Sequence, residues 1–211
     1  TNLYDQKHDI SIPLDLLRNA KGLCFLTVVK AGFVISGRVG TGLVIARRPD
    51  GSWSPPTAIG TVGVGWGALI GGDITDYLLV LNTDGAVRSF GGTGTSGTVN
   101  LGAELGVAMG PVGRSATGNV QASDEGVHPV YAYAHSKGLF VGMSFEGSVV
   151  TSRPDVNAKF YGRPLEPAHI LFDATVPQPR AAEPLYEALD LAMGIEIPVD
   201  GIRPSQLLTK K

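Results

Sequence analysis

Glycine placement constrains the fold of this chain more than any other sequence feature. Of the 29 glycines in 211 residues, 25 lie between residues 32 and 147. Within residues 59–68, Gly63, Gly65 and Gly67 alternate with bulkier side chains, and residues 101–110 repeat this alternation. Successive side chains of a strand point to opposite faces, so these glycines share one face. Such a face lets a backbone or a large side chain pack closely against the sheet, or lets the sheet curve tightly.

The distribution of proline and of apolar residues predicts a folded, β-dominated protein. Only Pro111 and Pro129 occur between residues 57 and 153, and proline is kept out of central strands because it lacks an N–H donor. Hydrophobic residues make up 43% of the chain and no Gly-X-Y repeat is present, which excludes disorder and collagen. We therefore expect an α+β fold. A curved antiparallel glycine-rich sheet or small barrel is joined by short helices at the N-terminus and in the C-terminal region.

Turn and cap signals set the expected element boundaries. A short helix is expected from Ser11, with Pro13 in its first turn and Gly22 at its end. Turns are expected at residues 30–32, 49–51 and 136–138. The strands expected between these signals cover residues 23–29, 33–38, 42–48, 59–68, 74–81, 101–110, 117–121, 130–134 and 139–150. Further helices are expected at residues 83–90, 155–161, 167–172 and 181–193, the last with an apolar stripe of Leu185, Ala188, Leu189 and Ala192.

Cysteine usage and the length of the uncharged segments favour a cytoplasmic protein. Cys24 is the only cysteine and the chain has no Asn-x-Ser/Thr sequon, so nothing in the sequence argues for disulfides or secretion. The uncharged run at residues 57–72 is shorter than the roughly 20 residues of a membrane-spanning helix. We expect no transmembrane segment and one domain over residues 12–193, with flexible tails at residues 1–11 and 198–211.

The sequence contains no complete catalytic or metal-binding motif. Residues 92–97 have the Gly-x-Gly-x-x-Gly spacing of a dinucleotide-binding loop, but a helix is expected before them and a strand after them, the reverse of what that loop requires. Ser144 is followed by Glu146 where a nucleophile elbow needs its second glycine. Asp73 and Asp76 fall on opposite faces of a strand and are expected to be turn or edge acids; the alternative, a Ca²⁺ or Mg²⁺ pair, requires the strand to start between them. We predict no enzyme, cofactor or metal site, with a serine hydrolase using Ser144 as the alternative.

Charge is unevenly distributed along the chain. Residues 1–48 carry a net charge of +4 and the remainder −6, which sum to the overall −2. Cations near exposed leucines at the chain start suit an interfacial contact, in which apolar insertion and attraction to anionic lipid act together. A solvated charged face is the alternative. The cations expected to bind lipid are Arg18, Lys21, Lys30, Arg38, Arg47, Arg48 and Lys137.

Several ordered motifs resemble one family, the SYLF domains. The motifs are Ala20-Lys-Gly-Leu23, Lys30-Ala-Gly-Phe33, Gly40-Thr-Gly-Leu-Val-Ile-Ala-Arg47, Pro49-Asp-Gly-Ser-Trp-Ser-Pro55, Gly110-Pro-Val-Gly-Arg114, Ser136-Lys-Gly-Leu-Phe140, Gly142-Met-Ser-Phe-Glu-Gly147, Asn157-Ala-Lys-Phe-Tyr-Gly162 and Pro184-Leu-Tyr186. The resemblance spans about residues 12–193. Family members occur in a yeast actin-patch protein, an SH3-containing mammalian protein and plant FYVE-containing proteins, and residues 47–53 are most similar to the plant type.

The resemblance implies a module that binds phosphatidylinositol phosphates in a membrane-trafficking or endocytic adaptor, peripheral on endosomal or plasma membranes. From the yeast and animal members it also implies binding to actin filaments, and it implies no enzymatic activity. No nucleic-acid partner is expected. Residues 1–11 are shorter and more polar than the basic helix usual before the Ala-Lys-Gly motif, and Ala134-His135 replaces the usual Tyr-Ser. A purely structural, oligomerising β-domain is a third hypothesis.

Overall fold

The computed structural model describes residues 12–91, 98–109, 112–123 and 126–194. Five antiparallel strands form one sheet in the order β1-β2-β5-β3-β4, and β4 also pairs with β5. The strands are β1 (Gly22–Ala46), β2 (Thr57–Leu81), β3 (Thr98–Met109), β4 (Val112–Ser123) and β5 (Gly126–Ser152). The helices are α1 (Leu14–Arg18), α2 (Asp84–Gly91), α3 (Pro154–Tyr161), α4 (Pro167–Phe172) and α5 (Glu183–Ala192), with a 3-10 turn at Arg180–Ala182. The β-dominated α+β fold and the curved antiparallel sheet are confirmed.

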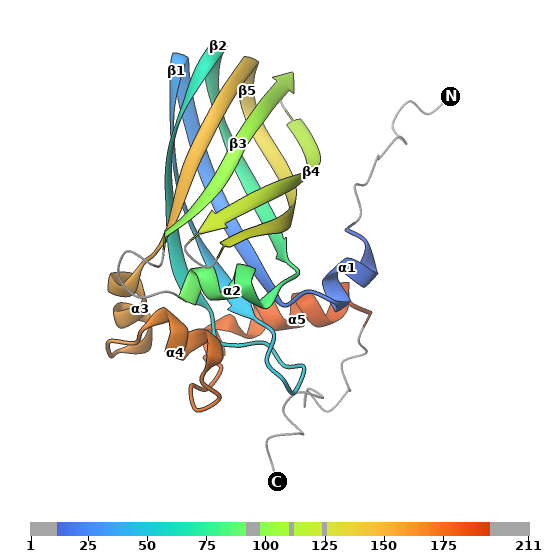
Figure 1. Ribbon diagram of the computed structural model, residues 1–211, viewed down its shortest axis with the longest axis vertical. Helices are drawn as coiled ribbons and strands as arrows, with labels where there is room; N and C mark the ends of the chain where they lie inside the picture. The colour runs from blue at the N-terminus through green and yellow to red at the C-terminus, as the bar shows by residue number, and fades with distance from the viewer. Residues whose placement is uncertain (1–11, 92–97, 110–111, 124–125, 195–211) are drawn as a thin grey trace.

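All five helices gather at one end of the sheet, which we call the base; the opposite end is the distal end (Figure 1). The longest strands run from the base to the distal end and return. In β1 the two halves lie side by side, because the N–H of Arg47 donates to the carbonyl of Lys21 at 2.7 Å and Gly42 lies directly against the carbonyl of Phe25. The reversal falls at Val34, whose φ is +62°. Since β2 pairs with both halves of β1, and β5 with the full length of β2, the sheet curls around an interior.

Glycine makes this tight curl possible at defined points. A Cβ at Gly63 would lie 2.5 Å from the carbonyl oxygen of Gly147 and 2.8 Å from the side chain of Arg38. Real Cβ atoms do not approach so closely, so Gly63 leaves the space that the arginine occupies. The inner face therefore receives a large side chain on bare backbone, as the glycine alternation predicts.

Two apolar clusters stabilise the base half of the sheet, one on each face. The inner cluster joins β1, β2 and β5 to Phe90 of α2 and Leu171 of α4. The outer cluster joins β1 to Leu17 of α1 and Leu189 of α5. Each fully buried large apolar side chain contributes about 1.5–3 kcal/mol. Cys24 belongs to the inner cluster, is fully buried and unpaired, and its burial raises the pKa of its thiol.

The helices begin where their cap and proline signals predict. Thr83 caps α2, since its Oγ1 accepts the N–H of Ala86 at 3.1 Å. Helices α3, α4 and α5 each carry proline in the first turn, where a missing N–H costs nothing. In α5 the side chains that are buried are Tyr186 and Leu189, so the predicted stripe is correct for Leu189 and wrong for Ala188 and Ala192, which are exposed.

Three expected boundaries are wrong. Residues 30–32 and 136–138 are not turns: both segments lie within continuous strands, and β1 reverses at Val34 instead. Consequently the expected separate strands at 23–29, 33–38 and 42–48 are one element, as are those at 59–68 and 74–81. Gly22 starts β1 and does not end the helix, because α1 closes on Asn19. The turn at 49–51 is confirmed, with Gly51 at φ +83°.

No helix among the described residues is both long and apolar enough to cross a membrane.

Candidate functional site

The seven cations predicted to bind lipid do not form one surface. Lys30 and Arg38 lie on the inner face of the sheet, with exposed fractions of 9% and 8%. Arg38 Nη2 donates to the hydroxyl of Tyr77 at 3.2 Å, and its guanidinium stands 5.9 Å from the centre of that ring. These two cations are therefore part of a polar interior and are not presented to a membrane surface.

Arg47 connects three segments at the base. Its guanidinium donates to the carbonyls of Gly51 at 3.1 Å, Leu17 at 3.3 Å and Ala20 at 3.4 Å. It also lies 4.1 Å from the ring centre of Trp53, a cation–π distance. Burial lowers the pKa of Arg47, although the group stays charged at any physiological pH. The side chain is an internal clamp between β1, the turn after it and α1.

Arg48 has a similar role toward the C-terminal region. Its Nη2 donates to the carbonyl of Asp173 at 3.0 Å and to that of Val176 at 2.9 Å. Only three of the seven predicted cations are exposed: Arg18 and Lys21 at the base, and Lys137 in β5. Arg18 also donates to the carbonyl of Met193 at 3.0 Å. The register pairs Lys137 with Ile74, so the two share the outer face.

The outer face of the distal half is apolar, and sequence reasoning missed its orientation. Two rows of paired residues make up this face. The lower row pairs Val29 with Ile74 and Val39 with Val62. The upper row, nearer the distal end, pairs Phe33 with Ile70 and Ile35 with Trp66. Their exposed fractions run from 47% to 71%. We call these eight residues the distal apolar face. The alternation of glycine with Val64 and Trp66 was the available signal, but a pattern of period two does not say which face is outside.

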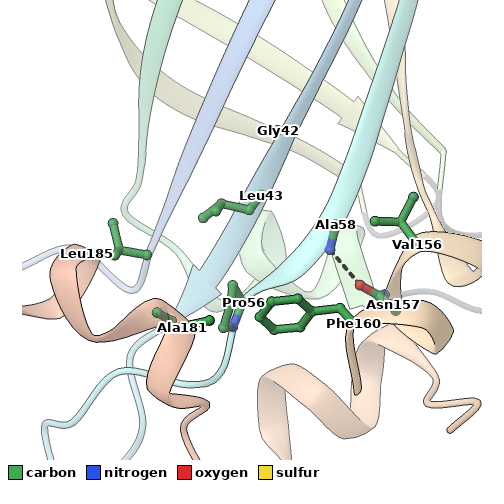
Figure 2. A pocket seen from close by; sticks show the side chains of 10 residues that line it. Gly42, Leu43, Pro56, Ala58, Val156, Asn157, Phe160, Ala181 and Leu185 are labelled. Atoms are coloured by element: carbon green, nitrogen blue, oxygen red, sulfur yellow. Dashed lines mark hydrogen bonds between the residues drawn. The ribbon is translucent and has the colours of Figure 1, made fainter. Parts of the chain in front are cut away.

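A second apolar feature lies at the base. A groove of about 270 Å³ is bounded by β1, the start of β2, α3 and α5 (Figure 2). Its lining residues are Gly42, Leu43, Pro56, Ala58, Val156, Asn157, Phe160, Ala181, Ala182 and Leu185. The amide of Asn157 is already used, since its oxygen accepts the N–H of Ala58 at 2.8 Å and its nitrogen donates to Thr57 at 2.9 Å. The groove therefore offers apolar contact with no uncommitted side-chain amide.

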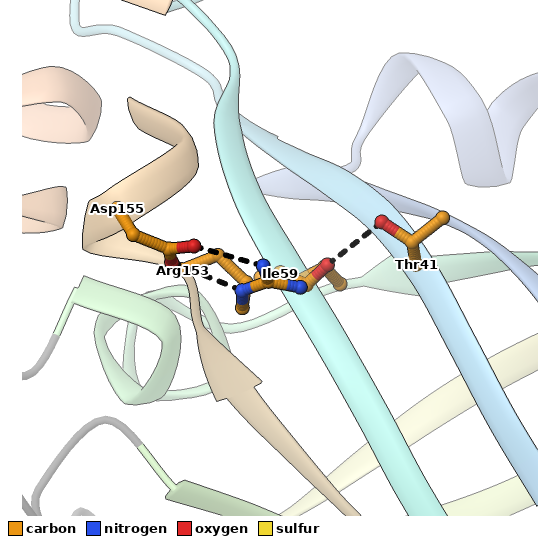
Figure 3. Close-up of polar contacts among 4 residues, drawn as sticks. All are labelled: Thr41, Ile59, Arg153 and Asp155. Atoms are coloured by element: carbon orange, nitrogen blue, oxygen red, sulfur yellow. Dashed lines mark hydrogen bonds and ion pairs between the residues drawn. The ribbon is translucent and has the colours of Figure 1, made fainter. Parts of the chain in front are cut away.

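Next to the groove, one exposed ion pair lies between the end of β5 and the first turn of α3. Arg153 holds Asp155 at 2.9 Å and lies over Gly60, and on the neighbouring strand Thr41 donates to the carbonyl of Ile59 at 3.5 Å (Figure 3). The hydrogen bond from Arg153 lowers the pKa of Asp155 to about 2. Both side chains are exposed to solvent, so the ion pair contributes little to the stability of the fold.

The residues considered for catalysis or metal binding lie within strands of the sheet. Ser144 lies within β5, paired with Gly67 on one side and Gly106 on the other, and not on the strand-to-helix turn of a nucleophile elbow. Asp73 faces inward, accepting from Thr75 at 2.6 Å, whereas Asp76 faces outward. The expectation that they are turn or edge acids is wrong, because β2 lies between β1 and β5.

Residues 92–97 lie outside the described residues; α2 precedes them and β3 follows, as expected. The described residues contain no group of three or more His, Cys, Asp or Glu side chains that could hold a metal ion. The described residues present an apolar face and an apolar groove to solvent, features that are typical of an interaction domain. The predicted domain limits of 12–193 stay a prediction.

Comparison with known proteins agrees with this class. Residues 62–192 match the Ysc84 family, described as "Las17-binding protein actin regulator". The chain is 44% identical over 182 residues to LAS seventeen-binding protein 3 of Saccharomyces cerevisiae, which covers 86% of this chain and 39% of that protein. It is 45% identical over 182 residues to the SH3 domain-containing YSC84-like protein 1 of Homo sapiens, covering 86% of this chain and 52% of that protein. No solved structure matches.

The chain therefore belongs to the Ysc84 family, and the SYLF resemblance drawn from its motifs is confirmed. The relatives are named for binding and for their SH3 domains, not for catalysis. The chain spans about two fifths to one half of their lengths.

Proposed function

We propose that this domain is the membrane-binding and actin-linked module of an endocytic adaptor. In this proposal it binds anionic phosphoinositides and actin filaments, and lies peripherally on endosomal or plasma membranes. The observation that carries the proposal is the match over 86% of the chain to a protein named for binding LAS seventeen, in a family described as actin regulators. Because the chain spans only 39% of that relative, the partners of the whole relatives are themselves part of the proposal.

The exposed cations are the residues that support the lipid part. Lys137 extends from the outer face of the sheet beside Ile74, while Arg18 and Lys21 lie at the base near α1. Each cation near an anionic membrane contributes about 1 kcal/mol, and the attraction is screened by salt. Lys30, Arg38, Arg47 and Arg48 are excluded from this set because their guanidinium or ammonium groups serve the interior of the fold.

Vesicle co-sedimentation tests the lipid part. Wild-type protein is expected to sediment with phosphatidylcholine vesicles that contain phosphatidylinositol bisphosphate, less so as salt increases. Two variants distinguish the ends of the molecule: Lys137→Glu at the outer sheet face, and Arg18→Glu with Lys21→Glu at the base. Lys159→Glu with Arg163→Glu, on the exposed surface of α3 and just after it, is the control that matches the base variant in charge. Equal binding by all four proteins would remove the exposed cations from the proposal.

Actin co-sedimentation tests the other part. The family description names actin regulation, and the distal face, the base groove and the exposed cations are the surfaces available for a filament. Purified filaments pelleted with the 211-residue chain are expected to carry it into the pellet at micromolar filament concentrations. No enrichment over a filament-free control would remove actin from the proposal and leave the lipid part standing.

A further inference from the structure

We infer that the distal end of the sheet inserts into the hydrocarbon of a single membrane leaflet, with the distal apolar face against acyl chains. This inference rests on the membrane part of the proposed function, and it adds which end of the molecule enters and how deeply. The surface involved is built from β1 and β2, and the helices all lie at the opposite end (Figure 1).

The polarity of the distal half is inverted relative to a water-soluble sheet. Outside, Phe33, Ile35 and Trp66 have exposed fractions of 71%, 67% and 70%. Inside, Lys30 and Arg38 are more than nine-tenths buried, and Ser36 and Thr75 are buried beside them on the same face. Exposed contiguous apolar surface of this kind marks an interaction site. An apolar medium outside the sheet suits this arrangement. The apolar side chains of the outer face would contact that medium, while the charged groups of the inner face would stay in the polar interior.

The boundary of the apolar face favours a lipid surface as its occupant. One row nearer the base, the register positions on the outer face are Asp76, Thr27 and Thr41, all exposed. The hydroxyl of Thr27 donates to the carboxylate of Asp76 at 2.7 Å, so this polar pair links β1 to β2. The apolar-to-polar change thus occurs at one level on three neighbouring half-strands, and on the fourth this level is Gly60, which Arg153 covers. A membrane surface meets neighbouring strands at one level along their length, which gives such a boundary. A protein that docks on one side of the sheet would instead limit the apolar patch to some of the strands.

The dimensions fit one leaflet. From Val29 to Phe33 the strand advances four residues, about 13 Å at the usual rise. A bilayer core is about 30 Å thick, so the face reaches about the depth of one leaflet. Lys137, paired with Ile74 at the lower row, has a stem long enough to return its ammonium to the headgroups.

The backbone of β2 also meets the requirement of an apolar medium. Peptide groups in hydrocarbon must be bonded within the protein. The half of β2 that contains Ile74 pairs with both β1 and β5, and so does the half that contains Val62. The ladder between β1 and β2 continues to Phe33 and Ile70 on one side and Ile35 and Trp66 on the other. The apolar residues of β2 therefore lie on a strand that is hydrogen-bonded on both edges, and those of β1 lie on a strand hydrogen-bonded to β2 along one edge.

Trp66 is a built-in reporter of insertion. The chain has two tryptophans; Trp66 is 70% exposed on the upper apolar row, and Trp53 is 4% exposed at the base. On addition of vesicles, the emission of Trp66 is expected to shift to shorter wavelength and to be quenched by lipids brominated along the acyl chain. The same measurement on Trp66→Phe is expected to show neither change. Unchanged emission of the wild-type chain in the presence of vesicles that it co-sediments with would overturn the inference.

A matched pair of variants tests the apolar face without removing the reporter. Ile35→Gln with Ile70→Gln places two amides on the upper row, where both side chains are more than half exposed, so folding is expected to be retained. Leu14→Gln with Leu191→Gln makes the same chemical change at the base. The distal variant is expected to bind vesicles at least about tenfold more weakly, and the base variant within about twofold of wild type. Equal loss in both variants would overturn the inference.

The failure of this inference and that of the proposed function are distinguishable. Phosphoinositide-dependent sedimentation without acyl-chain quenching leaves the proposed function and overturns insertion. Quenching in pure phosphatidylcholine vesicles with no effect of phosphoinositide supports insertion and overturns headgroup recognition. Absence from both kinds of vesicle overturns both. A dimer in light scattering that dissociates in the distal variant, together with no quenching, makes a second copy the occupant and also overturns insertion.

Discussion

Replacing Arg47 is expected to destabilise the whole domain, even though sequence reasoning placed this residue on a lipid-binding surface. The guanidinium donates to four carbonyls, those of Gly51, Leu17 and Ala20 at 3.1–3.4 Å and that of Arg18 at 3.5 Å. In Arg47→Ala these carbonyls lose their partner and the ring of Trp53 loses its stacked cation. At about 1 kcal/mol net for each of the three shorter hydrogen bonds, the free energy of unfolding falls by about 3 kcal/mol. For a chain of this size that lowers Tm by roughly 6–12 °C.

Urea unfolding followed by circular dichroism measures this change. Arg47→Lys keeps the charge but has no planar fork, so a single ammonium cannot reach Leu17 and Gly51 together, and we expect about half of the loss. Arg88→Ala, on the exposed surface of α2, is the charge-matched control and should stay within about 0.5 kcal/mol of wild type. If the urea midpoint of Arg47→Ala is the same as that of Arg88→Ala, the proposed stabilising role of Arg47 is refuted.

Three further predictions concern the sheet and its junction with α3. Gly63→Ala puts a methyl group against backbone on the inner face and should cost about 1–3 kcal/mol in urea unfolding, whereas Gly37→Ala, with open space at its Cβ, should be neutral or slightly stabilising. Asn157→Ala removes two hydrogen bonds, one buried and one partly buried, and should lower the free energy of unfolding by about 2–3 kcal/mol, with Tm as the readout. Asp155 should titrate near pH 2 by NMR, and Arg153→Ala should raise that pKa toward about 3.9. Because the folded-state pKa of Asp155 is lowered, its small stabilising contribution is complete above about pH 4 and is lost as pH falls through 2; a wild-type pKa near 4 would contradict this.

The helices were predictable because their signals are local. A proline in the first turn and a threonine cap act within four residues, so the starts of α2, α3 and α4 followed from short windows of sequence. The glycine alternation likewise indicated a tightly curved sheet. Both kinds of signal concern neighbours along the chain.

The strand reversals could not be predicted in the same way. Lys30 interrupts an apolar run, which suggested a turn, but inside a curled sheet a buried lysine continues the ladder because the interior is polar at that level. The reversal is instead at Val34, a residue type that disfavours positive φ, so no local signal marks it. Placement of the bend depends on the pairing of β1 with β2, in which the pairs that flank Val34 are Phe33 with Ile70 and Ile35 with Trp66, more than 30 positions apart in the chain.

The cations illustrate the same limit for the candidate site. Arg47 and Arg48 resemble surface cations in sequence, yet their hydrogen-bond acceptors are carbonyls up to 128 residues away. The amino-acid composition gives the number of charged side chains but does not identify the groups with which they interact. Only the fold separates Lys21 and Lys137, which are exposed, from Lys30 and Arg38, which are not.

The position of β5 in the sheet has a consequence for how the protein is made. β5 is the last strand to be synthesised, and it pairs with β2, β3 and β4. While the ribosome is still adding residues 126–152, β1 and β2 can pair with each other, but β2 has a free edge along its whole length. An open edge next to exposed valines and isoleucines favours self-association. The nascent chain therefore passes through an aggregation-prone interval that ends only when residue 152 has left the ribosome, so truncations before that point should accumulate as insoluble protein.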